Sequence, residues 1–276
     1  MLLLFRQPTG PIAHAVEHIT FHQDYRPLHA REVFVPDGGC EVVIDLSDAP
    51  KQRWHDEHGE RFDMHKRGWV SGMRTTRIVI GVGSGAPMLV LRLRPGVLHA
   101  LIGMPANELN DTVVDLDLLL GAVFGSVRDA LGETLEQRGA QAMLDETEEV
   151  LAPLFPASTV ERRVGIALQV LLHRNGIGTV GAISDELGCS QKHLNDLFQR
   201  HCGLGPKRYA SLVRFQSLVR RLERETDPDW AQLALEHGFY DQSHMVNQFQ
   251  EMTGYTPTRY MQVKGPFLNW LPVDAR

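Results

Sequence analysis

The sequence predicts an α+β protein in two parts, a β-rich domain over residues 1–157 and an all-α domain over residues 158–276. Strand-like runs followed by helical patterns predict the first part, and a duplicated helical unit predicts the second. The chain has 276 residues, of which 43% are hydrophobic and 22% charged, enough for a substantial core. This composition excludes a disordered chain, a collagen-like fibre and a small disulfide scaffold.

Four strand-like runs, separated by turns rich in Gly and Pro, predict the β-rich domain: residues 15–21, 41–46, 77–82 and 88–93. Helical patterns follow, at residues 96–102, 116–120, 127–131 and 133–151, and the last of them is strongly acidic. Two prolines between residues 153 and 159 then interrupt the helical pattern, and polar residues open the next one. We therefore place the border between the two domains there.

Charge is distributed unevenly along the chain. Residues 1–158 carry 14 basic and 22 acidic side chains, and residues 159–276 carry 14 basic and 12 acidic ones. The second part can approach a polyanion, although its charge alone does not indicate nucleic acid. The apolar run at the beginning is only five residues long, too short for a signal peptide or a membrane span, so we expect a cytoplasmic protein without a membrane partner. The three cysteines have no C-x-x-C spacing and indicate reduced thiols.

An internal repeat occupies the last hundred residues. Six residues recur 51 positions further on, in the pairs Leu194/Met245, Phe198/Phe249, Gly203/Gly254, Pro206/Pro257, Arg208/Arg259 and Tyr209/Tyr260. Just upstream the offset is 50, so the second copy has one extra residue in a turn. Each copy is predicted to form a helix, a tight turn and a second helix.

Capping residues define the helices of the first copy. Thr179 is expected to begin a helix that Gly188 ends, because Thr is a favoured N-cap and Gly accepts the left-handed conformation that follows a helix. Ser190 is expected to begin a second helix over residues 191–201, and Gly203 to end it.

The second copy has capping residues and a helix-ending glycine at corresponding positions. Asp229, with Gln232 three residues further on, is a capping-box pattern at the start of its first helix. Asp241 is expected to begin a helix over residues 242–252, and Gly254 follows it. Between the copies, the helical spacing of residues 206–224 predicts one linker helix of about 28 Å, comparable with the ~34 Å between major-groove faces one DNA turn apart.

A helix-turn-helix unit lays its second helix, which we name the reading helix, in the major groove, where short polar side chains can pair with base edges. Amide side chains can pair with adenine through two hydrogen bonds, and Val246 could contact a thymine methyl group. Such units also occur as structural or protein-binding modules, but two in tandem with polar reading helices favour DNA. The candidate DNA-binding residues are Gln191, Lys192, Asn195, Asp196, Gln242, Ser243, His244, Val246 and Asn247.

The C-terminal region resembles the DNA-binding domain of AraC/XylS-type transcription regulators. The motifs LGCSQKHLNDLF, GLGPKRY, LALEHGFYDQSHMVNQF and TGYTPTRY carry this resemblance within residues 160–263. It implies regulation of transcription from double-stranded promoter DNA, contact with RNA polymerase, and control by a small-molecule effector. It also implies base contacts from Lys192, Asn195 and Asp196 in the first reading helix and from Gln242, Ser243, Val246 and Asn247 in the second.

The chain departs from the family pattern at two of these positions. Members of the family often have Arg where this chain has Asp196 and Asn247. We therefore expect modest affinity of a monomer and reliance on a homodimer or on DNA shape.

The N-terminal part resembles, more loosely, the cupin-like domain of a subset of these regulators. The phrases PDGGCEVVIDL, WVSG, LRPG and ELNDTVVDL carry this resemblance. It implies a domain that senses a small molecule and takes part in dimerisation. The effector-binding residues stay unassigned, and Arg92 and His99 are open to two interpretations, contacts to an anionic effector or ordinary surface and salt-bridge residues.

An enzyme is not expected, and no catalytic residue or cofactor is assigned. The sequence has no Gly-rich phosphate loop, no G-x-S-x-G motif and no pair of carboxylates spaced for acid–base work. The alternative is a cupin-type metalloenzyme fused to a DNA-binding domain. His14, His18 and His22 are expected to share one face of a strand, but without a compact motif of metal ligands we expect no metal site.

Overall fold

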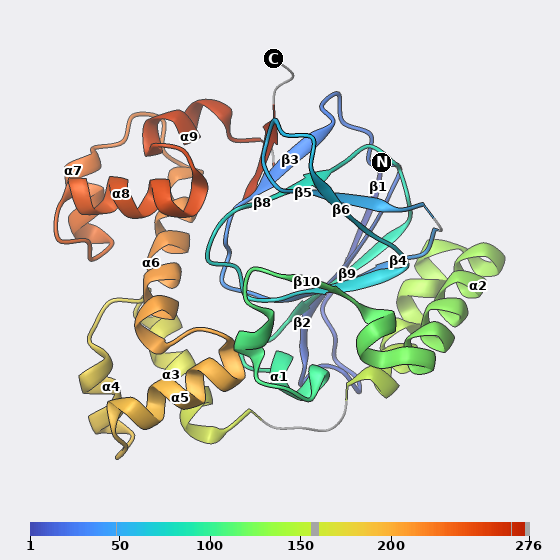
Figure 1. Cartoon of the computed structure of the whole chain (residues 1–276), viewed down its shortest axis with the longest axis horizontal. Coiled ribbons are helices and arrows are strands. Elements are labelled where there is room, and N and C mark those ends of the chain that lie inside the picture. Colours follow the sequence, from blue (N-terminus) through green and yellow to red (C-terminus); the bar gives the residue numbers. More distant parts are fainter. Residues whose placement is uncertain (48, 156–159, 266, 274–276) are drawn as a thin grey trace.

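The computed structural model describes residues 1–47, 49–155, 160–265 and 267–273, and the chain forms a sheet-rich part and a helical part (Figure 1). The sheet-rich part contains two antiparallel sheets, and the helical part follows it along the chain. This confirms the predicted α+β class. The predicted border between residues 157 and 158 lies outside the described residues.

The first sheet has six strands. Their order is β1 (Leu2–Arg6), β2 (Val16–Gln23), β9 (Met88–Leu93), β4 (Glu41–Asp45), β7 (Gly68–Ser71) and β10 (Val113–Asp115). Alternation along β9 separates two faces, because Leu89, Leu91 and Leu93 are buried and the residues between them are half-buried. The buried face packs against the helices of the same part, where Gly68 leaves room for the ring of Phe124.

The second sheet has five strands, one of which comes from the end of the chain. The order is β11 (Trp270–Val273), β3 (Arg31–Phe34), β8 (Ile78–Gly81), β5 (Lys51–Trp54) and β6 (Phe62–His65). Strand β11 was not among the predicted strands; it pairs with β3 so that Trp270 lies opposite Phe34. Its edge position tolerates Pro272, which has no N–H to donate to a neighbouring strand.

The helices of the sheet-rich part are α1 (Leu98–Ile102), the 3-10 turns η1 (Ala106–Leu109) and η2 (Ala152–Leu154), and α2 (Leu116–Leu151). Helix α2 takes in three of the predicted helical segments. Its backbone leaves helical geometry at Gly121 (φ 53°) and at Gly139 (φ 84°), conformations that glycine adopts without steric cost.

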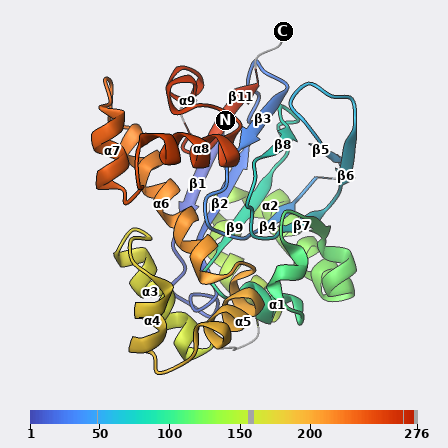
Figure 2. The same cartoon turned by 60° about the vertical axis from the view of Figure 1, so that its left-hand side comes forward.

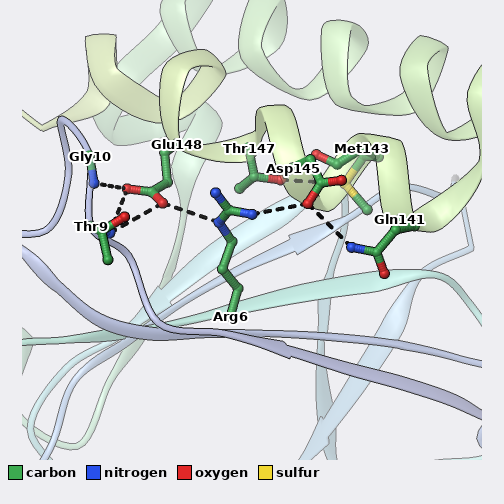
Figure 3. A network of polar contacts seen from close by, with 8 residues as sticks. All are labelled: Arg6, Thr9, Gly10, Gln141, Met143, Asp145, Thr147 and Glu148. Carbon is green, nitrogen blue, oxygen red and sulfur yellow. Dashed lines mark hydrogen bonds and ion pairs between the residues drawn. The ribbon is translucent and has the colours of Figure 1, made fainter.

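Ion pairs and hydrogen bonds connect β1 and the segment after it to α2 (Figure 3). Arg6 pairs with Asp145 and with Glu148, each at 3.1 Å. Glu148 also accepts hydrogen bonds from the backbone N–H groups of Thr9 (3.1 Å) and Gly10 (2.6 Å). Burial opposes ionisation of this carboxyl, but the hydrogen bonds from Gly10, Arg6 and Thr9 prevail and lower its pKa.

The helical part contains two helix-turn-helix units joined by one long helix, α6 (Pro206–Leu222) (Figure 2). The first unit consists of α4 (Val180–Glu186) and α5 (Gln191–Cys202), and the second of α7 (Trp230–Glu236) and α8 (Gln242–Thr253). Phe198 of the first unit packs edge-on against Tyr209 of α6, and Phe249 of the second packs against Phe215 of α6. The sequence predicted a helical pattern after residue 159, where α3 (Arg162–His173) lies, without giving its bounds, and it did not predict α9 (Pro257–Val263).

The expected row of three histidines does not form. Strand β2 begins at Val16, so His14 lies in the turn before it, while His18 and His22 share one face of the strand. His14 instead lines a small pocket together with His99 and His201. Within the described residues, no group of three or more His, Cys, Asp or Glu is arranged to hold a metal ion. None of the described helices is both long and apolar enough to cross a membrane.

Candidate nucleic-acid interface

The predicted capping residues position the first reading helix, α5. The Thr179 hydroxyl accepts a hydrogen bond from the Ala182 N–H at 3.2 Å, and the Ser190 hydroxyl accepts one from the His193 N–H at 3.2 Å. Gly203 ends the helix in the left-handed conformation (φ 84°). These local interactions satisfy groups that a helix end leaves without partners, which is why the sequence defines the unit well.

The second reading helix, α8, begins and ends in the same manner. Asp241 accepts a hydrogen bond from the His244 N–H at 2.7 Å, and Gly254 follows the helix at φ 79°. Asp229 caps α7 as predicted, but the reciprocal bond of a capping box does not form, because the Gln232 side chain donates to Glu236 at 2.6 Å. That part of the prediction is wrong.

The polar face of α5 is open to solvent. Gln191, Lys192 and Asp196 are exposed. Asn195 of the same helix is half-buried, because its side chain lies against Gly205, the residue that precedes α6. In the described part of the chain, neither Lys192 nor Asp196 has an ion-pair partner. The side chains at the beginning of this helix are therefore available to a partner outside the protein.

The polar face of α8 is open as well. Gln242, Ser243 and Asn247 are exposed, whereas Val246 is half-buried against the hydrophobic core. His244 is exposed too, but its Nδ1 accepts a hydrogen bond from the Tyr240 N–H at 3.2 Å. This predicted DNA-binding residue therefore also stabilises the turn that leads into the helix.

The apolar faces of both reading helices point into the protein. The buried residues are Leu194, Phe198 and Cys202 on α5 and Met245, Phe249, Met252 and Thr253 on α8. The two polar faces are thus presented on the outside by equivalent helices at different positions along α6.

An open cleft of about 490 Å³ separates the two units. Lys207 and Arg208 are exposed at the beginning of α6, and Arg208 lies 3.9 Å from Glu251 of α8. The sequence analysis missed these two cations as candidate site residues, although the motif GPKRY places them directly after the Pro that begins the helix. The cleft is lined by Thr75, Asn195, Gln199, Leu204, Gly205, Lys207, Arg208, Ser211, Leu212, Gln248, Glu251 and Met252.

A second set of polar side chains lies between the two sheets. Lys51 of the second sheet pairs with Asp45 of the first at 3.4 Å, and His65 lies 2.7 Å from Asp115. Three buried ring and guanidinium nitrogens in this region have no hydrogen-bond partner in the described structure: Nδ1 of His22, Nε of Arg53 and Nε2 of His65.

The two residues left open as effector contacts have partners within the protein. Arg92 pairs with Asp37 and lies 3.5 Å from Glu41, so its charge is balanced internally. The His99 ring donates a hydrogen bond from Nδ1 to Met104 O at 2.7 Å and packs edge-on against His201 of α5, with ring centroids 5.0 Å apart. Burial, and then the neighbouring His99, lower the pKa of His201.

Family models and solved structures provide the comparison. Residues 183–262 match the model of a helix-turn-helix domain, and residues 5–115 match a domain of unknown function, DUF6597. No curated protein matches the chain at a significant level. ToxT from Vibrio cholerae, with an unsaturated fatty acid bound, is 10% identical with a TM-score of 0.46, covering 88% of this chain and 94% of that one. The AraC-like transcriptional activator CuxR is 15% identical with a TM-score of 0.22, covering 80% and 86%.

A helix-turn-helix domain with two tandem units, each with an exposed polar helix, is typical of one class of protein, the DNA-binding regulators of transcription. Within that class, the C-terminal part is a helix-turn-helix domain of the AraC type, and it follows a sheet-rich N-terminal part. The resemblance seen in the sequence motifs is thereby confirmed.

Proposed function

We propose that this protein is a sequence-specific regulator of transcription that inserts α5 and α8 into successive major grooves of promoter DNA. The observation that carries the proposal is the exposure of equivalent polar faces in both units. The 17 residues of α6 span about 26 Å, so the units are separated on the scale of one ~34 Å turn of the duplex. We assign base contacts to Gln191, Lys192, Asn195 and Asp196 on α5 and to Gln242, Ser243, His244, Val246 and Asn247 on α8.

The cleft between the units supports the same arrangement. When two reading helices occupy successive major grooves, the intervening phosphate backbones face the space between the units. Lys207 and Arg208 lie in that space and would meet the phosphates. Asp196 repels phosphates unless it accepts a hydrogen bond from a cytosine amino group, so we propose that a homodimer supplies the remaining affinity.

The two parts of the chain have different proposed roles. We propose an effector-sensing and dimerising domain over residues 1–157 and a DNA-binding domain over residues 158–276 that acts on RNA polymerase at the promoter. The effector is a small polar molecule bound between the two sheets. The support is the set of buried nitrogens of His22, Arg53 and His65 that lack hydrogen-bond partners and lie in one region, since most buried polar groups in proteins have a partner.

The DNA assignment is tested by selecting duplexes from a random library with the purified chain and measuring affinity for the selected site. The variant Gln242→Ala with Asn247→Ala removes two amides from α8 and should lose preference for the site by about 10-fold or more. The matched control, Gln137→Ala with Gln141→Ala, removes two exposed amides from α2 and should bind like the parent. If both double variants bind alike, α8 does not read bases.

The effector assignment is tested by thermal melting of the full chain in the presence of a panel of small polar metabolites. A ligand that binds the native state raises the melting temperature. The increase should disappear in Arg53→Met, which removes the unpartnered Nε, and persist in Arg26→Met, which changes an exposed arginine. A compound that stabilises Arg53→Met as well as the parent would place the effector elsewhere.

A further inference from the structure

Two loops of the sheet-rich part contact the C-terminal ends of both reading helices. The Asn110 side-chain amide donates a hydrogen bond to the carbonyl of Gly203 at 2.6 Å. At Gly254 the guanidinium of Arg77 occupies the space that a Cβ atom would take. Gly203 and Gly254 are equivalent positions of the repeat, 51 residues apart. The sheet-rich part thus touches the same turn in each helix-turn-helix unit.

One residue, Asp111, joins the two loops into a single body. Its Oδ1 accepts hydrogen bonds from the N–H groups of Thr75 (2.7 Å) and Thr76 (3.3 Å), and its Oδ2 accepts one from the Thr75 hydroxyl at 2.6 Å. Its own N–H donates to the Met73 carbonyl at 3.0 Å. Asp111 has φ 55°, a left-handed conformation that Asp and Asn tolerate better than most residues. We name residues 73–77 and 110–111 the docking platform.

The platform bridges a space that the two units do not fill themselves. The cleft between the units is lined by Gln199 of α5, by Gln248 and Glu251 of α8, and by Thr75 of the platform. Helix α6 connects the units at one side of this cleft only. This single connection would allow one unit to bend and twist against the other. Contacts of the platform with both Gly203 and Gly254 add two points of attachment that oppose those motions.

We propose that the docking platform sets the mutual arrangement of α5 and α8, and through it the spacing and helical phase of the two DNA half-sites that the chain accepts. Asp111 is the positioning residue, because it holds the loop that meets Gly254 to the loop that meets Gly203. A displacement within the sheet-rich part then reaches both reading helices together. The part of the proposal that concerns DNA spacing rests on the proposed function.

The mutual arrangement is measured without DNA. Spin labels are attached to Lys192→Cys and Ser243→Cys, equivalent exposed positions of α5 and α8, in a full chain that also carries Cys189→Ser because the other two cysteines are buried. We expect a single narrow distance distribution in this parent and a distribution at least about twice as wide in Asp111→Ala, because the loops lose three hydrogen bonds to the carboxylate.

Two further variants separate positioning from folding. Asp111→Asn keeps an Oδ1 acceptor and tolerates the left-handed backbone, so it should restore the narrow distribution. Asp129→Ala removes an exposed carboxylate from α2 and should leave the width unchanged. A distribution as narrow in Asp111→Ala as in the parent would overturn the proposal, and so would equal broadening in Asp111→Asn.

The consequence for DNA is measured on the selected site with five base pairs inserted between its half-sites, which turns them to opposite faces of the duplex. The unlabelled wild-type chain should lose about 10-fold or more in affinity, and Asp111→Ala should lose less than about 3-fold. Equal losses in both proteins would overturn the assignment of half-site spacing to the platform. A wild-type chain that binds no duplex would instead overturn the proposed function, and the distance measurement would still decide the role of Asp111.

Discussion

Replacing Gln216 should weaken the junction between the helical part and the sheets. Gln216 lies on α6 with 3% of its surface exposed, and its side-chain amide donates hydrogen bonds to Pro36 O at 2.6 Å and to Asn269 Oδ1 at 3.0 Å. Pro36 follows β3 and Asn269 precedes β11, so one side chain joins three segments. In Gln216→Ala both acceptors stay buried without this donor. Each buried acceptor left without a donor costs about 1–3 kcal/mol, so we expect the two acceptors together to lower the free energy of unfolding by about 3 kcal/mol.

Urea denaturation followed by tryptophan fluorescence measures this loss, since Trp270 packs against Phe34 where β11 meets β3. A change of about 3 kcal/mol corresponds to a fall of roughly 6–12 °C in melting temperature for a chain of this size. Gln250→Ala, an exposed glutamine on α8, is the matched control and should change the free energy by less than about 0.5 kcal/mol. If Gln216→Ala were no more destabilising than this control, the buried hydrogen bonds would not hold the junction.

Three further predictions concern helix ends and titration. Asp241→Ala should lower the melting temperature, at a cost of about 1 kcal/mol, because the His244 N–H loses its acceptor; an unchanged melt would contradict this. The pKa of Glu148 is lowered, so the ionised carboxylate stabilises the folded state above the ordinary pKa of 4.5, and this stabilisation is lost as the pH falls toward the folded pKa. In urea denaturation at pH 7 and pH 3.5, the free energy of unfolding should therefore decrease less in Glu148→Gln than in the parent. The pKa of His201 is lowered in the folded state, so the unfolded chain takes up the proton first and the free energy of unfolding should fall as the pH decreases below 6.5. This fall should be smaller in His201→Gln, and equal dependence of the free energy of unfolding on pH in both proteins would contradict the prediction.

The sequence predicted the helical units well because their signals are local. A capping side chain and the helix that it begins lie within three residues of each other, as at Ser190 and Asp241, and the left-handed glycines lie one residue past the helices they end. The repeat then showed that both units share one pattern. The exposed polar faces of the reading helices follow directly from helical spacing.

The arrangement of the two parts depends on contacts between distant residues, which no local pattern reports. The contact of Asn110 with Gly203 spans 93 residues, and nothing in either segment indicates the other. Strand β11 is four residues long and contains Pro272, a composition that argues against a strand. His14 was placed on a strand by period-two spacing, but backbone pairing begins only at Val16.

The pairing of β11 with β3 has a consequence for biosynthesis. Phe34 and Trp270, which face each other in the finished sheet, are 236 positions apart, so one side of β3 has no partner until nearly the whole helical part has left the ribosome. Unpaired strand edges favour association with other chains, and contacts of long sequence separation form slowly. We expect nascent chains that lack β11 to depend on chaperones, and the second sheet to be completed only when both helix-turn-helix units already exist.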